Sequence, residues 1–122
     1  MRIIIAHVDA VARRALNLLL ESRPPLDVID EAKNKDELLA QVNTWAPELV
    51  ILDADLSGGE TRDLISSLRE IVNPLGVIVM SGYQENEEAF LESGADAIYK
   101  KGTPSRDLFV AIETVRFLRK SS

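Results

Sequence analysis

Three polar side chains in this sequence come directly after short apolar runs. Asp53 follows "LVIL", Ser81 follows "VIVM", and Lys101 follows "DAIYK". A carboxylate among apolar neighbours is poorly solvated, so Asp53 needs a cation, a hydrogen-bond donor or a covalent bond. The Ser81 hydroxyl can donate to a phosphoryl or carboxylate oxygen. Taken singly, Asp53 could instead cap a loop, Ser81 could serve a turn, and Lys101 could be an ordinary solvated lysine.

The three residues would lie close together if the runs before them are neighbouring strands of one sheet. Short apolar runs alternate with longer amphipathic stretches, which indicates a parallel sheet with helices on both faces. The carboxyl ends of such strands share one edge, where ligands bind. Asp53, Ser81 and Lys101 would then converge on one small anion. The expected strands are 2–5, 26–32, 49–52, 76–80 and 96–100, and the expected helices are 10–21, 35–45, 61–71, a fourth ending near 93, and 104–119.

Capping residues set the expected ends of the helices. Asp9 is expected to cap the first helix, and Asn34 with Glu37 forms a capping box for the second. Thr103 is expected to cap the last helix, with Pro104 at its first position. The apolar face of the last helix is expected to contain Leu108, Ile112, Val115 and Leu118.

The composition is that of an ordinary globular domain. The 122 residues suit one domain over 1–122, and 46% apolar with 28% charged residues excludes a disordered chain. The absence of cysteine excludes thiolate chemistry and fits the cytoplasm. No apolar run approaches the roughly 20 residues that span a membrane. The net charge of −6 argues against direct contact with nucleic acid, although it suits a cation, a basic partner or simple solubility.

The order and spacing of the motifs resemble the receiver domain of bacterial two-component response regulators. The resemblance rests on "LVILDADLSGGE" around Asp53, "VIVMSG" with Ser81 and "GADAIYKKGTPSRDL" with Lys101, and covers essentially the whole chain. It implies a flavodoxin-like (βα)5 α/β fold, a doubly wound parallel sheet of five strands in the order 2-1-3-4-5. "KGTP" followed by a helix is similar to receivers joined to a helix-turn-helix domain, which would make residues 1–122 the N-terminal part of a longer regulator.

The resemblance also implies a role for each residue in a phosphorelay. Asp53 would accept a phosphoryl group from a sensor histidine kinase or a phosphotransfer protein. Lys101 would pair with a phosphoryl oxygen, and Ser81 would move toward the phosphoryl group. The face of helix four, strand five and helix five would then bind an output domain, a partner protein or a second copy. Such a domain signals; it is not expected to be an enzyme beyond its own phosphorylation and slow dephosphorylation.

The match fails at the two positions after the first strand. Receivers carry two acidic residues there, which hold Mg²⁺ together with the phosphoacceptor aspartate, whereas this chain has His7 and Val8. Mg²⁺ prefers oxygen ligands, so valine contributes nothing and histidine suits softer ions. We therefore expect weak or absent Mg²⁺ binding, and slow phosphorylation or none.

Two nearby acids could compensate for the lost pair. Asp9 is one, although its expected place is the helix cap. Asp55 is the other; the family uses the backbone carbonyl there as a metal ligand, and the Asp55 side chain could reach inward instead. If a metal binds, Asp53 and Asp55 are its expected ligands. Asp53 could otherwise pair with Lys101 or a protonated His7, which would hold the site in one state.

A further departure concerns the residue that reports activation in receivers. The family usually has an aromatic residue at the position of Ile98, and its inward or outward placement tracks activation. Tyr99 is next along the strand and should point to the opposite face of the sheet, so it should not replace that reporter. Isoleucine at position 98 could also simply pack.

Two other functions remain open on the sequence. A pseudo-receiver would keep the fold as a phosphorylation-independent interaction module, which the lost acid pair favours and the retained Asp53, Ser81 and Lys101 oppose. "DADLS" after an apolar strand also resembles the haloacid dehalogenase phosphohydrolases, with Asp53 as nucleophile and Asp55 as acid/base. That family needs a later acidic pair, and none follows a strand after Lys101.

Overall fold

The chain folds as alternating strands and helices around one parallel sheet. A computed structural model describes residues 1–56, 60–82 and 87–120, and the elements below are those of this described part. The strands pair in parallel in the order β2-β1-β3-β4-β5, as expected. The elements are β1 Arg2–Ala6, α1 Ala10–Glu21, β2 Asp27–Ala32, α2 Lys35–Trp45, β3 Leu49–Asp53, α3 Thr61–Ile71, β4 Gly76–Ser81, α4 Glu87–Glu92, β5 Ala97–Lys100 and α5 Ser105–Lys120.

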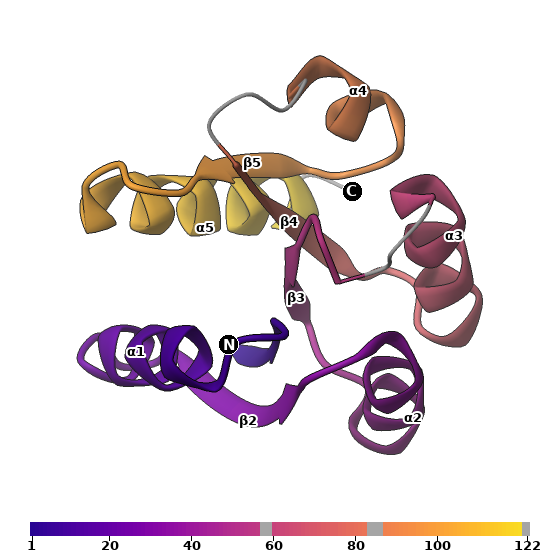
Figure 1. The fold of residues 1–122 in the computed structure, drawn as a ribbon, viewed down its shortest axis with the longest axis horizontal. Helices are drawn as coiled ribbons and strands as arrows, with labels where there is room; N and C mark the ends of the chain where they lie inside the picture. Colours follow the sequence, from indigo (N-terminus) through magenta and orange to yellow (C-terminus); the bar gives the residue numbers. More distant parts are fainter. Residues whose placement is uncertain (57–59, 83–86, 121–122) are drawn as a thin grey trace.

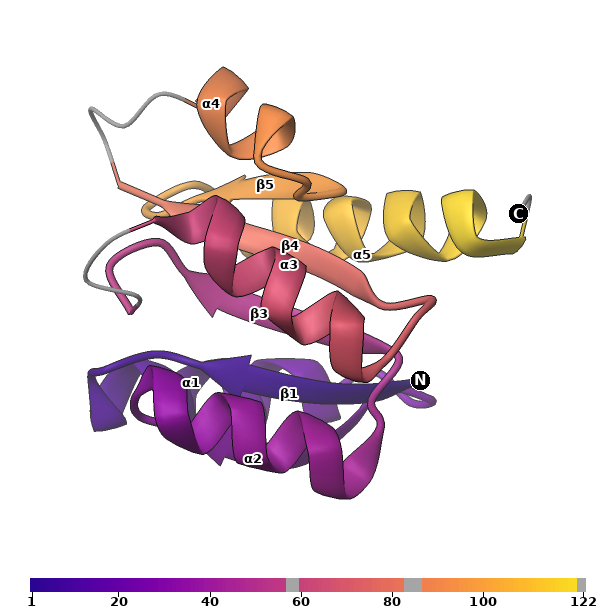
Figure 2. The ribbon, with the colours of Figure 1, turned by 90° about the vertical axis from the view of Figure 1, so that its right-hand side faces the viewer.

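Helices cover both faces of the sheet. Figure 1 shows α1 and α5 on one side, with α2 and α3 on the other. In Figure 2 the strands from β1 to β5 lie one above another, and α4 lies at the β5 end. This doubly wound arrangement explains why β3 and β4 consist of buried residues throughout, because both faces of a central strand are covered.

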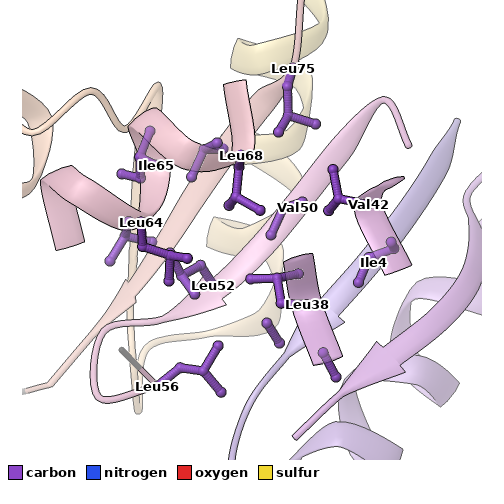
Figure 3. Close-up of a cluster of buried hydrophobic side chains, with 14 of the residues drawn as sticks. Ile4, Leu38, Val42, Val50, Leu52, Leu56, Leu64, Ile65, Leu68 and Leu75 are labelled. Atoms are coloured by element: carbon purple, nitrogen blue, oxygen red, sulfur yellow. The ribbon is translucent and has the colours of Figure 1, made fainter. Parts of the chain in front are cut away.

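Alternation along the strands divides the core between the two faces. Ile3 and Ile5 pack toward α1 and α5, whereas Ile4 packs toward α2 and α3, and all three are fully buried. Figure 3 shows the second cluster, in which leucine and isoleucine side chains of α2 and α3 meet Val50 and Leu52 of β3. Both clusters hold β3 rigidly from either side, so Asp53 at its end has a fixed position.

The expected capping residues hold the helices that flank the site. The Asp9 carboxylate accepts from the amide of Val11 at 3.0 Å, and the Asn34 side chain accepts from the amide of Glu37 at 2.8 Å. The second half of the capping box differs from expectation: Glu37 accepts from the amide of Lys33, the residue before the cap. The carboxylate therefore fixes the turn into α2 and not the cap residue itself.

Helix α5 corrects two expectations. It begins at Ser105, and the hydroxyl of Thr103 donates to the carbonyl of Lys100 at 2.6 Å, so Thr103 closes the turn after β5 and does not cap the helix. Leu118 is exposed, whereas the rest of the expected apolar face is buried. The sequence also predicts a loop at Gly58 and Gly59 and a polar loop over 81–88; the first lies outside the described residues, as do residues 83–86 of the second. No helix in the part of the chain that is described is long and apolar enough to cross a membrane.

The cap of α1 gives a first prediction, because Asp9 was also a candidate metal ligand. Asp9→Ala should lower the free energy of unfolding by about 1 kcal/mol, since it removes the acceptor for the Val11 amide. Asp9→Asn should keep the stability, because asparagine caps equally well. Urea denaturation measures both. Equal losses in the two variants would contradict the cap and show that the charge itself is needed.

Candidate functional site

The site lies at the carboxyl edge of the sheet. Asp53 ends β3, Ser81 ends β4, His7 follows β1 and Lys101 follows β5. Strand order places β1 and β4 on either side of β3, and the amide of Lys101 donates to the carbonyl of Ser81 at 2.9 Å. Four chain segments that are distant in sequence are thereby brought together around one carboxylate.

Asp53 is the buried centre of this edge. Its side chain is only 1% exposed, and Oδ1 accepts from Lys101 Nζ at 2.5 Å. The same oxygen also accepts from the amide of Asp55 at 3.4 Å. The expected meeting of Asp53 with Lys101 is therefore observed, and the ammonium group neutralises a carboxylate that water cannot reach.

His7 faces the second oxygen of the same carboxylate. Its Nε2 lies 3.4 Å from Asp53 Oδ2, while its Nδ1 accepts from the amide of Asp9 at 3.0 Å. A nitrogen that accepts a hydrogen bond carries a lone pair, so the proton of the ring is on Nε2 and points to Asp53. His7 therefore faces Asp53 through Nε2, while the backbone of the loop uses Nδ1.

A guanidinium group that the sequence analysis did not single out holds the loop after β1. Arg13 Nη1 donates to the carbonyls of His7 at 2.7 Å and Val8 at 3.2 Å. Arg13 Nε lies 3.5 Å from Glu31 Oε1, and Asn17 donates to Glu31 Oε2 at 2.7 Å. The helical spacing of Arg13 and Asn17 on α1 was the signal for this network. The network pairs the charge of Arg13 with Glu31 and fixes the loop where receivers carry their acid pair.

Ser81 places a buried hydroxyl group at the end of β4. Its side chain is fully buried, and among the described residues Oγ makes no hydrogen bond. Buried hydroxyl groups normally make a hydrogen bond. The Ser81 hydroxyl at the end of β4 is therefore suited to donate to an oxygen of a ligand that binds at this edge. The site therefore combines a paired carboxylate with an unused donor.

Of the two remaining candidate acids, Asp55 lies at the exposed rim of the site and Asp9 caps a helix. The Asp55 side chain is 73% exposed, and its Oδ2 lies 3.9 Å from Lys101 Nζ. An outward Asp55 does not suit the acid/base role of a dehalogenase-like enzyme. Asp9 is engaged as the cap of α1, and Val8 is exposed.

These placements decide how well the site fits Mg²⁺. Within the described residues, no group of three histidine, cysteine, aspartate or glutamate side chains is arranged to hold a metal ion. Of the carboxylates that the structure describes, Asp53 alone is buried at this edge, and its two oxygens face Lys101 and His7. The side chains present do not fit Mg²⁺, because a hard cation needs several oxygen ligands.

Ile98 and Tyr99 point to opposite faces of the sheet, as expected. Ile98 packs against the cluster beneath α2 and α3, whereas Tyr99 packs on the side of α5. The Tyr99 hydroxyl donates to the carbonyl of Thr103 at 2.8 Å. Tyr99 is thus tied to the turn before α5, and it does not replace a movable aromatic side chain at position 98.

Comparison with known proteins decides the family. The model of the response regulator receiver domain matches residues 3–113. The chain belongs to the response regulator receiver domain family. Receiver domains of this family act in two-component systems, and the fold expected from the resemblance is confirmed.

Individual relatives show how far the likeness extends. The receiver is 31% identical over 118 residues to protein-glutamate methylesterase/protein-glutamine glutaminase 3 of Geobacter sulfurreducens, covering 95% of this chain and 31% of the relative. It is 27% identical to the oxygen regulatory protein NreC of Staphylococcus carnosus, covering 94% and 54%. The chain thus spans about a third to a half of these curated relatives.

Solved structures show the same fold. A response regulator receiver domain protein from Clostridium thermocellum superposes with a TM-score of 0.85 at 20% identity, covering 98% of this chain and 96% of that one. A LuxR-family response regulator from Aurantimonas gives 0.83 at 23% identity, covering 93% and 83%.

Removing Lys101 from the Asp53–Lys101 pair should destabilise the protein more than removing the charge of Asp53. Lys101→Met leaves a buried carboxylate without its cation and should lower the free energy of unfolding by about 2 kcal/mol. This loss is smaller than that for breaking a fully buried ion pair, because Lys101 is partly exposed. Asp53→Asn should cost less than about 1 kcal/mol, because Lys101 can turn to solvent.

Urea denaturation of the two single variants and the double variant measures this coupling. The double variant should be more stable than Lys101→Met alone, because no unpaired charge remains buried. Lys35→Met on the exposed face of α2 is the control for losing a lysine. A Lys101→Met loss no larger than that of the control would contradict the pairing.

Proposed function

We propose that this receiver signals through Asp53 as a phosphoacceptor that reacts far more slowly than the acceptor of a receiver with two acids after β1. One observation carries the proposal: Lys101 and His7 face the two oxygens of Asp53, and no further carboxylate among the described residues is buried beside them. The nucleophile and its cation are retained, while the ligands for a metal are missing.

The residues present would divide the chemistry among them. An Asp53 oxygen attacks the phosphorus of an acyl phosphate or phosphohistidine, the bond to the leaving oxygen or nitrogen breaks, and the leaving group takes the electron pair. Lys101 then pairs with a phosphoryl oxygen, and the unused Ser81 hydroxyl donates to another. His7 Nε2 lies 3.4 Å from the other oxygen of Asp53.

The missing carboxylates would limit the rate. Phosphoryl transfer depends on neutralising charge that develops on the phosphoryl oxygens, and each 1.36 kcal/mol lost costs about a factor of ten in rate. Lys101 supplies one charge, and it must first leave its place on Asp53 Oδ1. This requirement makes attack slower, since the nucleophile is already bound to the group that should stabilise the product.

Partners follow from the same proposal. A sensor histidine kinase or phosphotransfer protein would supply the phosphoryl group, and the face of α4, β5 and α5 would bind an output domain or partner protein. Exposed Leu91 on α4 suits such a face. Ile98 packs inward without an aromatic ring to move, so Lys101 and the turn that follows β5 would carry the change. We place the domain in the cytoplasm, where such kinases present their phosphoryl groups.

A second candidate is the phosphorylation-independent pseudo-receiver. His7 favours it, because the side chain that faces Asp53 Oδ2 at 3.4 Å is an imidazole and not a carboxylate that could bind Mg²⁺. In this version the ion pair would hold the domain permanently in one state, and binding of partners would be its entire function.

Restoring the acid pair separates the two candidates. The purified domain is incubated with acetyl phosphate and Mg²⁺, and intact mass is followed over time for the wild type and for His7→Asp/Val8→Asp. We expect slow labelling of the wild type and labelling at least about tenfold faster in the double variant. Asp53→Asn in either background should show no mass gain.

Other outcomes would overturn specific parts of the proposal. Equal, fast labelling of the wild type and the double variant would mean that the acid pair is dispensable here. Labelling of the double variant alone would favour the pseudo-receiver. A mass gain that persists in Asp53→Asn would move the acceptor to another residue.

A further inference from the structure

The ring of His7 is held beside Asp53 by contacts on several sides. The side chain of His7 is 12% exposed, and its Nε2 lies 3.4 Å from Asp53 Oδ2. The amide of His7 donates to the carbonyl of Ala32 at 3.0 Å, and its Nδ1 accepts from the amide of Asp9 at the same distance. Backbone groups of the neighbouring chain therefore fix the amide of this residue and one nitrogen of its ring.

A side chain of α1 binds the carbonyl group of the same residue. Arg13 Nη1 donates to the carbonyls of His7 at 2.7 Å and Val8 at 3.2 Å, so one nitrogen bridges the two residues that replace the acid pair of other receivers. Hydrogen bonds from a charged donor are stronger than those between neutral groups. The side chain of Arg13 is only 15% exposed, which protects the bond to His7 from competition by water.

Strand β2 holds the guanidinium group of Arg13 in turn. Its Nε lies 3.5 Å from Glu31 Oε1, and Asn17, one helical turn further along α1, donates to Glu31 Oε2 at 2.7 Å. A planar guanidinium can pair with a carboxylate through one nitrogen while another nitrogen binds carbonyl groups. One continuous chain of contacts therefore runs from β2 through Arg13 to His7 and Asp53.

We propose that Arg13 is a positioning residue, whose guanidinium group keeps the His7 ring beside Oδ2 of Asp53 and thereby slows phosphorylation of this carboxylate. Asp53 is 1% exposed, and a phosphodonor must reach one of its oxygens. Lys101 binds Oδ1 and the His7 ring lies beside Oδ2, so a ring that is free to move opens the second oxygen to attack on phosphorus. The placement of His7 stands by itself, whereas its effect on the rate rests on the proposed phosphoacceptor.

Chemical modification of the ring tests the placement, because His7 is the only histidine of the chain. Diethyl pyrocarbonate carbethoxylates histidine rings, and the mass of the peptide that contains His7 gives the rate. Arg13→Gln should speed the modification at least about tenfold, because a charged hydrogen bond to the loop is lost. Glu31→Gln, which leaves Arg13 in place without its counter-charge, should give a smaller increase. Arg14→Gln, at the next and exposed arginine of α1, is the matched control and should leave the rate unchanged.

Labelling by acetyl phosphate tests the consequence for Asp53. Arg13→Gln and His7→Ala should each be labelled at least about threefold faster than the wild type, because both open Oδ2 of the carboxylate. The double variant should be labelled no faster than His7→Ala alone, because Arg13 acts on the rate through His7. A general loosening of the fold would instead make the two effects multiply.

The two measurements separate this inference from the proposed phosphoacceptor. Unchanged reactivity of the ring in Arg13→Gln, or an equal increase in Arg14→Gln, would overturn the placement, and multiplying effects on labelling would overturn the action through His7. Absence of labelling in every variant, His7→Asp/Val8→Asp included, would overturn the phosphoacceptor, and the reactivity of the ring would still decide the placement. Circular dichroism shows which variants are folded, and Glu31→Gln replaces Arg13→Gln if the latter is not.

Discussion

The burial of one carboxylate at the end of β3 is the constraint on which the site depends. Asp53 is almost completely shielded from water by two hydrophobic clusters, so its charge must be balanced by groups that the fold brings to it. Strand order supplies them: Lys101 arrives from β5 and His7 from β1. The doubly wound sheet therefore determines the charge partners of the site as well as its position.

The replacements at His7 and Val8 change the electrostatic balance of this edge. A receiver with two further acids has excess negative charge, which Mg²⁺ neutralises. Here Lys101 already pairs with Asp53, His7 faces the second oxygen of that carboxylate, and the charge of Arg13 beside the loop is paired with Glu31. A divalent cation would find a single buried carboxylate among the described residues of the site, already paired with Lys101, whereas the Ser81 hydroxyl and Lys101 still suit a phosphoryl group.

Periodicity and capping residues made much of the fold predictable from the sequence. Apolar runs of four or five residues correctly predicted β3 and β4, and the capping residues Asp9 and Asn34 correctly predicted where α1 and α2 begin. These signals depend on residues that are close together in the chain, so they can be read from the sequence without knowledge of the fold. Leu118 was misplaced because helical periodicity continues beyond the sheet against which the helix packs.

The partners of Asp53 were only partly predictable. Its meeting with Lys101 followed from strands that end at one edge. The proton position on His7 and the Arg13 network depend on backbone geometry in the loop after β1, which residue types alone do not determine. The outward direction of Asp55 likewise depends on the course of the chain beyond β3.

Titration with Mg²⁺, followed by the amide resonances of Asp53, Asp55 and Lys101, measures whether this site binds a divalent cation. We expect no saturable change up to millimolar Mg²⁺, because the described site offers one buried carboxylate whose oxygens already face Lys101 and His7. Saturable shifts at these three residues would contradict it, and would show that Mg²⁺ displaces Lys101 and recruits oxygen ligands that the resting site does not present.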